Sequence, residues 1–114
     1  MFRSEGGARP APDAAWRPLA DIYRTDRGWL IKFELAGVPA EDILISASGR
    51  FLTVAGIRRD LTEDQVRSHH LMEIPYNRFE RTVELPCDVE SSHLDIQLRN
   101  GILTVRVSTE GEAE

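Results

Sequence analysis

The chain has 114 residues, a formal net charge of -5 and a single cysteine. Because typical domains contain about 100–150 residues, this length predicts one compact domain and excludes a multidomain enzyme. A lone cysteine cannot form an internal disulfide, so an apolar core must hold the fold together, as expected in the cytoplasm. The acidic balance argues against a nucleic-acid partner, and the sequence lacks an apolar run long enough to predict a membrane span.

The two ends of the chain have the composition of appendages. Residues 1–18 contain two glycines and three prolines without a helical or strand period, which predicts a flexible N-terminal arm. Residues 108–114 carry three glutamates and no basic residue, which predicts a solvated acidic C-terminal tail. Residues 19–107 remain to form the folded domain.

The first half of this domain has the alternation of β-strands. A short candidate strand runs from Leu19 to Arg24. It is followed by a run in which Trp29, Ile31, Phe33 and Leu35 fall on one face, with charged residues between them. A period of two is typical of a strand with one buried face.

Two hairpins can be predicted from register. A two-residue turn at residues 49–50, and a type I′ turn at Asn100-Gly101, each align the apolar positions of the flanking strands. The expected pairs are Ala47/Leu52, Ile45/Val54 and Ile43/Gly56 in the first hairpin, and Leu98/Leu103, Ile96/Val105 and Leu94/Val107 in the second.

One more candidate strand, Phe79 to Leu85, ends at Pro86. About seven short strands with almost no helical period predict an all-β fold, an antiparallel immunoglobulin-like β-sandwich. Residues 58–75 are the exception, because they show no sustained period. They could begin a helical turn at Thr62 or form an extended excursion. A segment this long is often functional, and we expect it to cross to a partner subunit.

The residues that could carry out catalysis do not form a defined group. Cys87, Asp88 and His93 are ingredients of a thiol nucleophile, but their spacing fixes no geometry. The adjacent His69 and His70 would point to opposite faces of a strand, so they are poorly placed to chelate one metal ion. There is no glycine-rich phosphate loop for ATP. We therefore expect no enzyme activity, no metal site and no cofactor.

Apolar sheet edges are the better candidates for binding. Ile43 and Ile45 lie in the first hairpin, and Leu94, Ile96 and Leu98 lie in the second. An edge with alternating apolar side chains accepts another chain by β-augmentation. The alternative is that these residues face the sandwich core, and both interpretations hold if a groove opens between the sheets.

Four sequences occur in an order known from one family. They are GVPAEDI from Gly37 to Ile43, LTVAG from Leu52 to Gly56 followed by two arginines, FER at Phe79 with LP at Leu85-Pro86, and NGILTV from Asn100 to Val105. In combination they resemble the α-crystallin domain of small heat-shock proteins over about residues 19–107.

The resemblance implies an ATP-independent holdase, which binds partly unfolded proteins and prevents their aggregation under stress. It implies a homodimer in which a strand of the long loop is exchanged between partners, and a groove between two edge strands. The residues assigned on this basis are Val66, His70, Leu71 and Met72 to the exchanged segment, Ile43, Ile45, Leu94, Ile96 and Leu98 to the client or peptide groove, and Phe2 and Trp16 to client contacts of the arm.

The chain also departs from the family pattern. Ile74 and Asn77 stand where many members have arginine and glycine, and Ile96 replaces a small alanine. Asparagine tolerates positive φ, so the turn at Asn77 is expected to be kept. An Ile-x-Ile or Ile-x-Val anchor is not found after Val107, which predicts dimers or small oligomers. The rival interpretation is a CS-type co-chaperone or adaptor that binds one folded partner.

Overall fold

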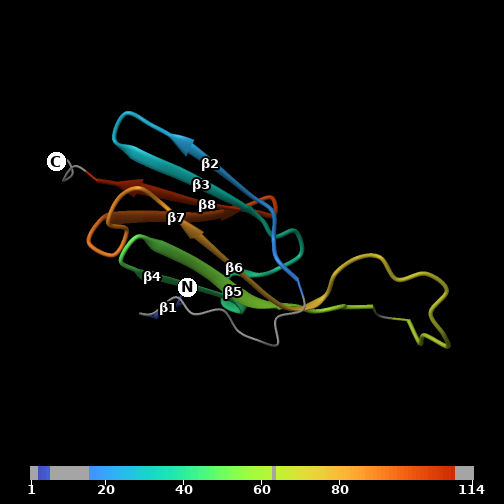
Figure 1. The fold of residues 1–114 in the computed structure, drawn as a ribbon. Helices are drawn as coiled ribbons and strands as arrows, with labels where there is room; N and C mark the ends of the chain where they lie inside the picture. The colour runs from blue at the N-terminus through green and yellow to red at the C-terminus, as the bar shows by residue number, and fades with distance from the viewer. Residues whose placement is uncertain (1–2, 6–15, 63, 110–114) are drawn as a thin grey trace.

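The computed structural model describes residues 3–5, 16–62 and 64–109, which form two four-stranded sheets packed face to face (Figure 1). The sheet orders are β1-β4-β5-β6 and β2-β3-β8-β7. The elements are β1 (Arg3–Glu5), β2 (Ala20–Arg24), β3 (Gly28–Glu34), the 3-10 turn η1 (Ala40–Asp42), β4 (Ile43–Ser48), β5 (Phe51–Arg58), β6 (Asn77–Glu84), β7 (His93–Arg99) and β8 (Ile102–Ser108).

Both predicted hairpins are confirmed, in the predicted register. The β4–β5 pair joins Ala47 to Leu52 and Ile45 to Val54, and the β7–β8 pair joins Leu98 to Leu103. At the second turn Asn100 has a φ of 53° and Gly101 a φ of 80°, the two positive values that a type I′ turn requires. The local turn chemistry and the apolar alternation therefore specify the same register.

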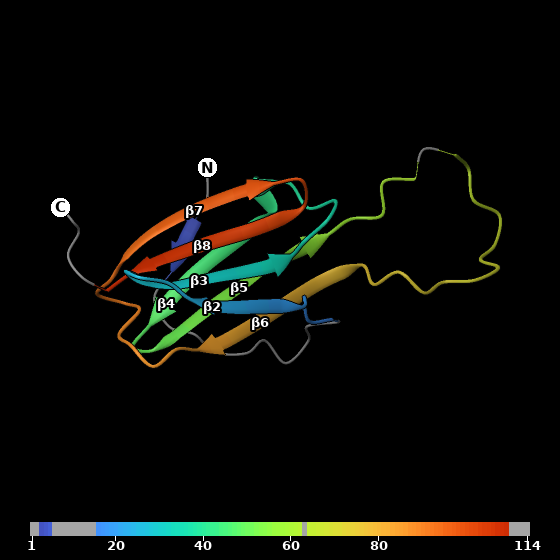
Figure 2. The ribbon, with the colours of Figure 1, turned by 90° about the horizontal axis from the view of Figure 1, so that it is seen from above.

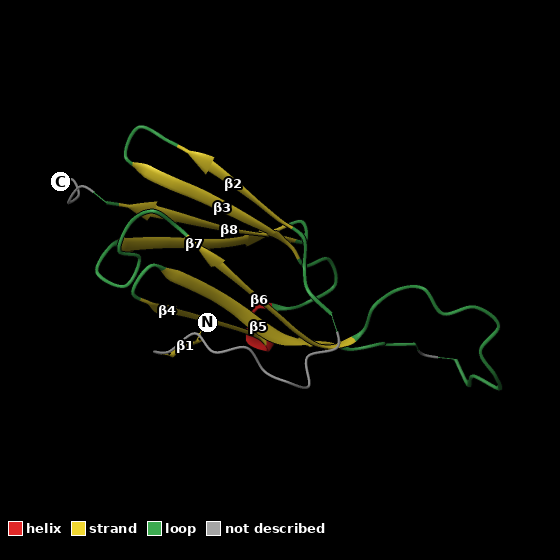
Figure 3. Ribbon diagram, viewed as in Figure 1, coloured by secondary structure: helices red, strands yellow, loops and turns green. Residues whose placement is uncertain are grey.

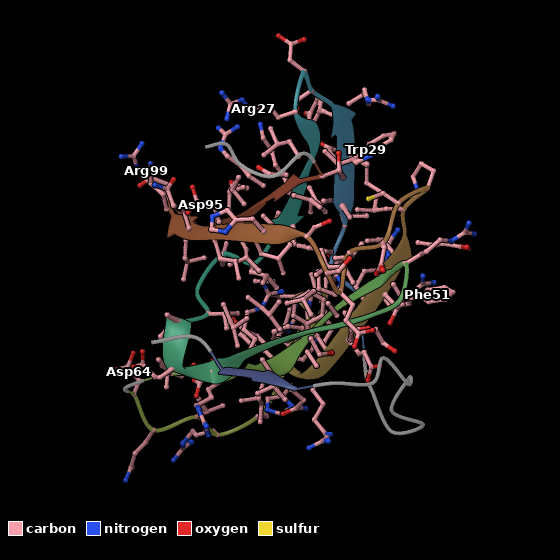
Figure 4. All side chains as sticks on the ribbon, turned by 90° about the vertical axis from the view of Figure 1, so that its left-hand side faces the viewer. Arg27, Trp29, Phe51, Asp64, Asp95 and Arg99 are labelled. Carbon is pink, nitrogen blue, oxygen red and sulfur yellow. The ribbon has the colours of Figure 1, made fainter. Side chains whose placement is uncertain are left out.

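The core lies between the sheets and is built from the inward faces of β3, β4, β5, β6 and β8, with residues of β7 packed against it (Figure 4). Figure 4 also shows that Asp95 and Arg99 of β7 lie on the outside of the sandwich. Successive side chains of a strand point to opposite faces, and these two positions alternate with the partly buried positions of β7. Burial of apolar surface is the main favourable term in folding. The largest buried side chains are Phe33, Phe79, Ile31, Leu35, Ile43, Ile45, Leu52, Leu85 and Leu103.

The start of β6 confirms the expected role of Asn77, whose φ is 78°. Strand β1 was not predicted, because three residues are too few to show a period. It pairs in parallel with β4, and its backbone groups can do this whatever side chains they carry. Residues 3–5 come from the segment predicted to be a flexible arm.

The long segment between β5 and β6 projects far from one end of the sandwich (Figure 2). Its described residues, 59–62 and 64–76, form neither strand nor helix in this single chain, as Figure 3 shows. Of the two alternatives left open by the sequence, the helical turn at Thr62 is not found among the described residues, which are irregular.

Candidate functional site

The residues assigned to the groove come from β4 and β7, which flank one side of the sandwich. Ile43 and Ile45 are 2% and 1% exposed, so they belong to the core. Leu94, Ile96 and Leu98 are only partly buried and pack against the margin of that core. The five residues therefore share one apolar region, but only the three from β7 offer surface to another chain.

The outer edge of β4 is already paired with the chain's own N-terminal segment. Strand β1 sets Arg3 opposite Leu44, Ser4 opposite Ile45 and Glu5 opposite Ser46. In Figure 2, β1 lies beneath β7, which is the edge of the other sheet on this side. A second chain that adds to β4 at these residues must first displace β1.

The two arm residues assigned to client contacts have different positions. Phe2 lies outside the described residues. Trp16 is half-buried and makes a parallel bridge to Phe79 of β6, so it packs against the margin of the core.

The loop carries the largest group of exposed apolar side chains among the described residues. Val66, Leu71 and Met72 of the predicted exchanged segment are 57%, 70% and 56% exposed, and His70 is exposed as well. Strand β2, at the edge of its sheet, exposes Ile22. An unpaired strand edge and exposed apolar side chains are the features that a second protein chain can cover.

A shallow depression of about 350 Å3 lies over η1 and strands β4, β5 and β6. Both signs of charge line it, because Asp42 and Arg59 are joined there by an ion pair of 3.2 Å. Such a mixed surface creates no uniform field for an anionic ligand. The described residues contain no group of three histidine, cysteine or acidic side chains that could hold a metal ion.

Cys87 has a thiol whose proton affinity is altered by its surroundings. Burial raises the pKa of its thiol, the Asp88 carboxylate raises it further, and Arg24 acts in the opposite direction. Less thiolate is therefore present at neutral pH than for an ordinary cysteine. This is the reverse of what a nucleophilic cysteine requires.

Alkylation of Cys87 tests this assignment. We expect the native protein at pH 7.5 to react with iodoacetamide more slowly than the protein unfolded in urea, and the native rate to rise as the pH passes the usual thiol range. Mass spectrometry of quenched samples measures both rates. A native rate equal to or above the unfolded rate would contradict the raised pKa.

Both the sequence and the fold match those of known proteins. The model of the "Hsp20/alpha crystallin family" matches residues 21–114. "Small heat shock protein C2" of Rickettsia felis is 30% identical over 90 residues, which cover 79% of this chain and 58% of the relative. "Small heat shock protein C4" of the same organism is 28% identical over 90 residues, which cover 79% of this chain and 55% of that relative. The chain thus spans a little over half the length of these relatives.

Solved structures agree with the fold. "Heat shock protein 16.0" from Schizosaccharomyces pombe superposes with a TM-score of 0.73 at 22% identity, covering 86% of this chain and 91% of that one. HspA from Xanthomonas axonopodis gives a TM-score of 0.71 at 23% identity, covering 88% and 100%. At these identities the likeness establishes the architecture.

Proposed function

Since the chain belongs to the Hsp20/alpha crystallin family, we propose that it is an ATP-independent holdase that binds partly unfolded proteins and prevents their aggregation under stress. The family match over residues 21–114 is the observation that carries this proposal. The exposed apolar side chains of the loop and of β2 support it, because unfolding proteins offer apolar surface and unpaired backbone in return. The holdase as proposed is not an enzyme and needs no cofactor.

We propose further that two copies form a homodimer by exchange of the loop segment that contains Val66 and Leu71. The segment is apolar and exposed, and β2 offers an edge strand on which a partner's segment could add. Small oligomers could be built from such dimers. A monodisperse shell of a dozen or more subunits in light scattering would overturn this proposal.

The proposed partners are unfolding proteins, with neither nucleic acid nor membrane among them, and the proposed location is the cytoplasm. The part of the chain that the structure describes contains no helix with the length and apolarity to cross a bilayer. We propose a division into an arm at 1–18, a domain at 19–107 and an acidic tail at 108–114; in the described parts of the arm, β1 and Trp16 pair with edges of the sandwich.

An aggregation assay without ATP tests the holdase. Several unrelated proteins are heated with substoichiometric to equimolar amounts of this chain, and light scattering is followed. We expect suppression for all of them, unchanged when ATP is added, and none from a folded control protein of similar size. Failure with every substrate, together with tight binding of one folded partner, would favour a CS-type adaptor instead.

A further inference from the structure

Arg58 occupies an unusual place for a charged residue. It ends β5, has the same inward parity as Leu52 and Val54, and is only 8% exposed. Its guanidinium donates to the carbonyl oxygen of Pro75 at 2.7 and 3.0 Å and to that of Ala36 at 3.0 Å. These bonds hold the guanidinium at the base of the long loop.

Trp16 covers this guanidinium with its aromatic face. The Arg58 Cζ atom lies 4.2 Å from the centre of the Trp16 ring and 5.7 Å from that of Tyr76. Phe79 packs against the same indole, with ring centres 5.2 Å apart. The indole N–H donates to the carbonyl oxygen of Asn77 at 3.2 Å. The indole therefore has a cation over its face, a neighbouring aromatic ring and an acceptor for its N–H.

The backbone around Trp16 adds to the edge of β6. The Trp16 N–H donates to the Arg78 carbonyl at 3.3 Å, and the Glu80 N–H donates to the Trp16 carbonyl at 3.2 Å. The Arg81 guanidinium donates to the Pro18 carbonyl at 2.9 Å. These contacts use the backbone and one aromatic side chain of the docked segment, so they recognise an extended segment with an aromatic residue.

The strand pairing of the docked segment is short. Its bridge to β6 spans one residue, whereas the antiparallel strands of the sandwich have five to eight residues. On its C-terminal side the segment is anchored again at the buried Pro18 and at Leu19, whose carbonyl oxygen accepts from the Glu34 N–H at 3.0 Å. Short segments outside the strand pairs open at a lower free energy than the core. Opening at Trp16 would break the contacts of Trp16 itself and leave the strand pairs of the sandwich formed.

We propose that the Trp16 receptor, defined as Arg58, Tyr76, Phe79 and the adjoining edge of β6, is a second peptide-binding site that takes an extended client segment with an exposed tryptophan or tyrosine. Trp16 is its resident occupant and must leave before a client enters. The buried cation makes the site selective, because a cation attracts the face of an aromatic ring and not an aliphatic side chain. The statement that the ligand is a segment of a client protein rests on the proposed holdase function.

The test uses full-length Trp16→Ala protein and a fluorescein-labelled peptide with the sequence of residues 13–19, DAAWRPL. We expect fluorescence anisotropy to give an affinity about tenfold higher for this peptide than for one with leucine in place of tryptophan. Wild-type protein should bind the tryptophan peptide at least about fivefold more weakly, because Trp16 occupies the site. Equal affinities for the two peptides, or for the two proteins, would overturn the proposal.

A second pair of variants locates the site. In the Trp16→Ala background, Tyr76→Leu removes a half-buried receptor ring and should weaken binding of the tryptophan peptide, whereas Phe51→Leu changes an exposed ring at the opposite end of β5 from Arg58 and should not. Circular dichroism confirms that both are folded. A lower oligomer mass for Trp16→Ala alone would show that a second copy's arm is the occupant and would overturn client binding.

The aggregation assay separates this proposal from the proposed function. Selective peptide binding without suppression of aggregation would keep the site and reject the holdase. Suppression without selective peptide binding would keep the holdase and reject the site.

Discussion

Ile45→Asp is expected to unfold the domain, whereas Ile96→Asp is expected to leave it folded and to weaken client capture. Ile45 is 1% exposed in the middle of the core cluster, so the new carboxylate would be buried without a partner. A buried charge left unpaired costs about 3–5 kcal/mol, which is a large part of the roughly 5–15 kcal/mol that stabilises a domain. Ile96 is only partly buried on β7, so its carboxylate can reach water.

Thermal unfolding followed by circular dichroism, beside the light-scattering assay, measures both effects. Ile45→Val is the matched control, because it keeps an apolar side chain and should cost about 0.5–1.5 kcal/mol. If Ile45→Asp remained folded and lost only client capture, Ile45 would belong to an open groove and the buried position described above would be wrong. If Ile96→Asp unfolded as well, the β7 residues would serve the core alone.

The hairpins could be predicted because the evidence for them is local. The turn at Asn100-Gly101 and the alternation on both sides of it fix one register, and a slip by one residue would expose every apolar side chain. The position of β1 could not be predicted in this way. Its pairing with β4 uses backbone groups from a segment of three residues, and neither composition nor period marks it.

The candidate groove shows the limit of periodicity. Alternation indicates that Ile43, Ile45 and Ile96 share an inward face, but it does not tell how much of that face the opposite sheet covers. The structure separates them, because β4 is flanked by β1 and β5 whereas β7 is an edge strand. Burial in a sandwich thus depends on the order of strands, which the sequence does not state.

The Trp16 receptor was missed although the sequence contains a signal for it. Arg58 and Arg59 are adjacent, and strand parity alone sends Arg58 inward with Val54 while Arg59 faces solvent and pairs with Asp42. An arginine on an apolar face needs partners, and here they come from Trp16 and from loop carbonyls far away in the chain. Parity would have identified the buried arginine but not those partners.

The exchanged strand gives the second large effect. A double variant, Leu71→Asp with Met72→Asp, is expected to raise the dimer dissociation constant at least about tenfold, because the two adjacent side chains point to opposite faces of an extended strand and the one that faces the partner loses roughly 1.5–3 kcal/mol of apolar burial. Light scattering after size-exclusion chromatography should show a fall from about twice 12.9 kDa to 12.9 kDa. Stability of the single chain should hardly change, because these side chains are 70% and 56% exposed within it.

Leu61→Asp provides the matched control. Leu61 lies in the same loop, outside the exchanged segment, and is 74% exposed. The same chemical change there adds charge to the loop without entering the proposed interface, so the dimer should persist. An equal loss of dimer in both variants would indicate general charge repulsion. Persistence of the dimer in the double variant would place the interface elsewhere and leave β2 without its proposed partner strand. The comparison therefore tests the location of the interface as well as its existence.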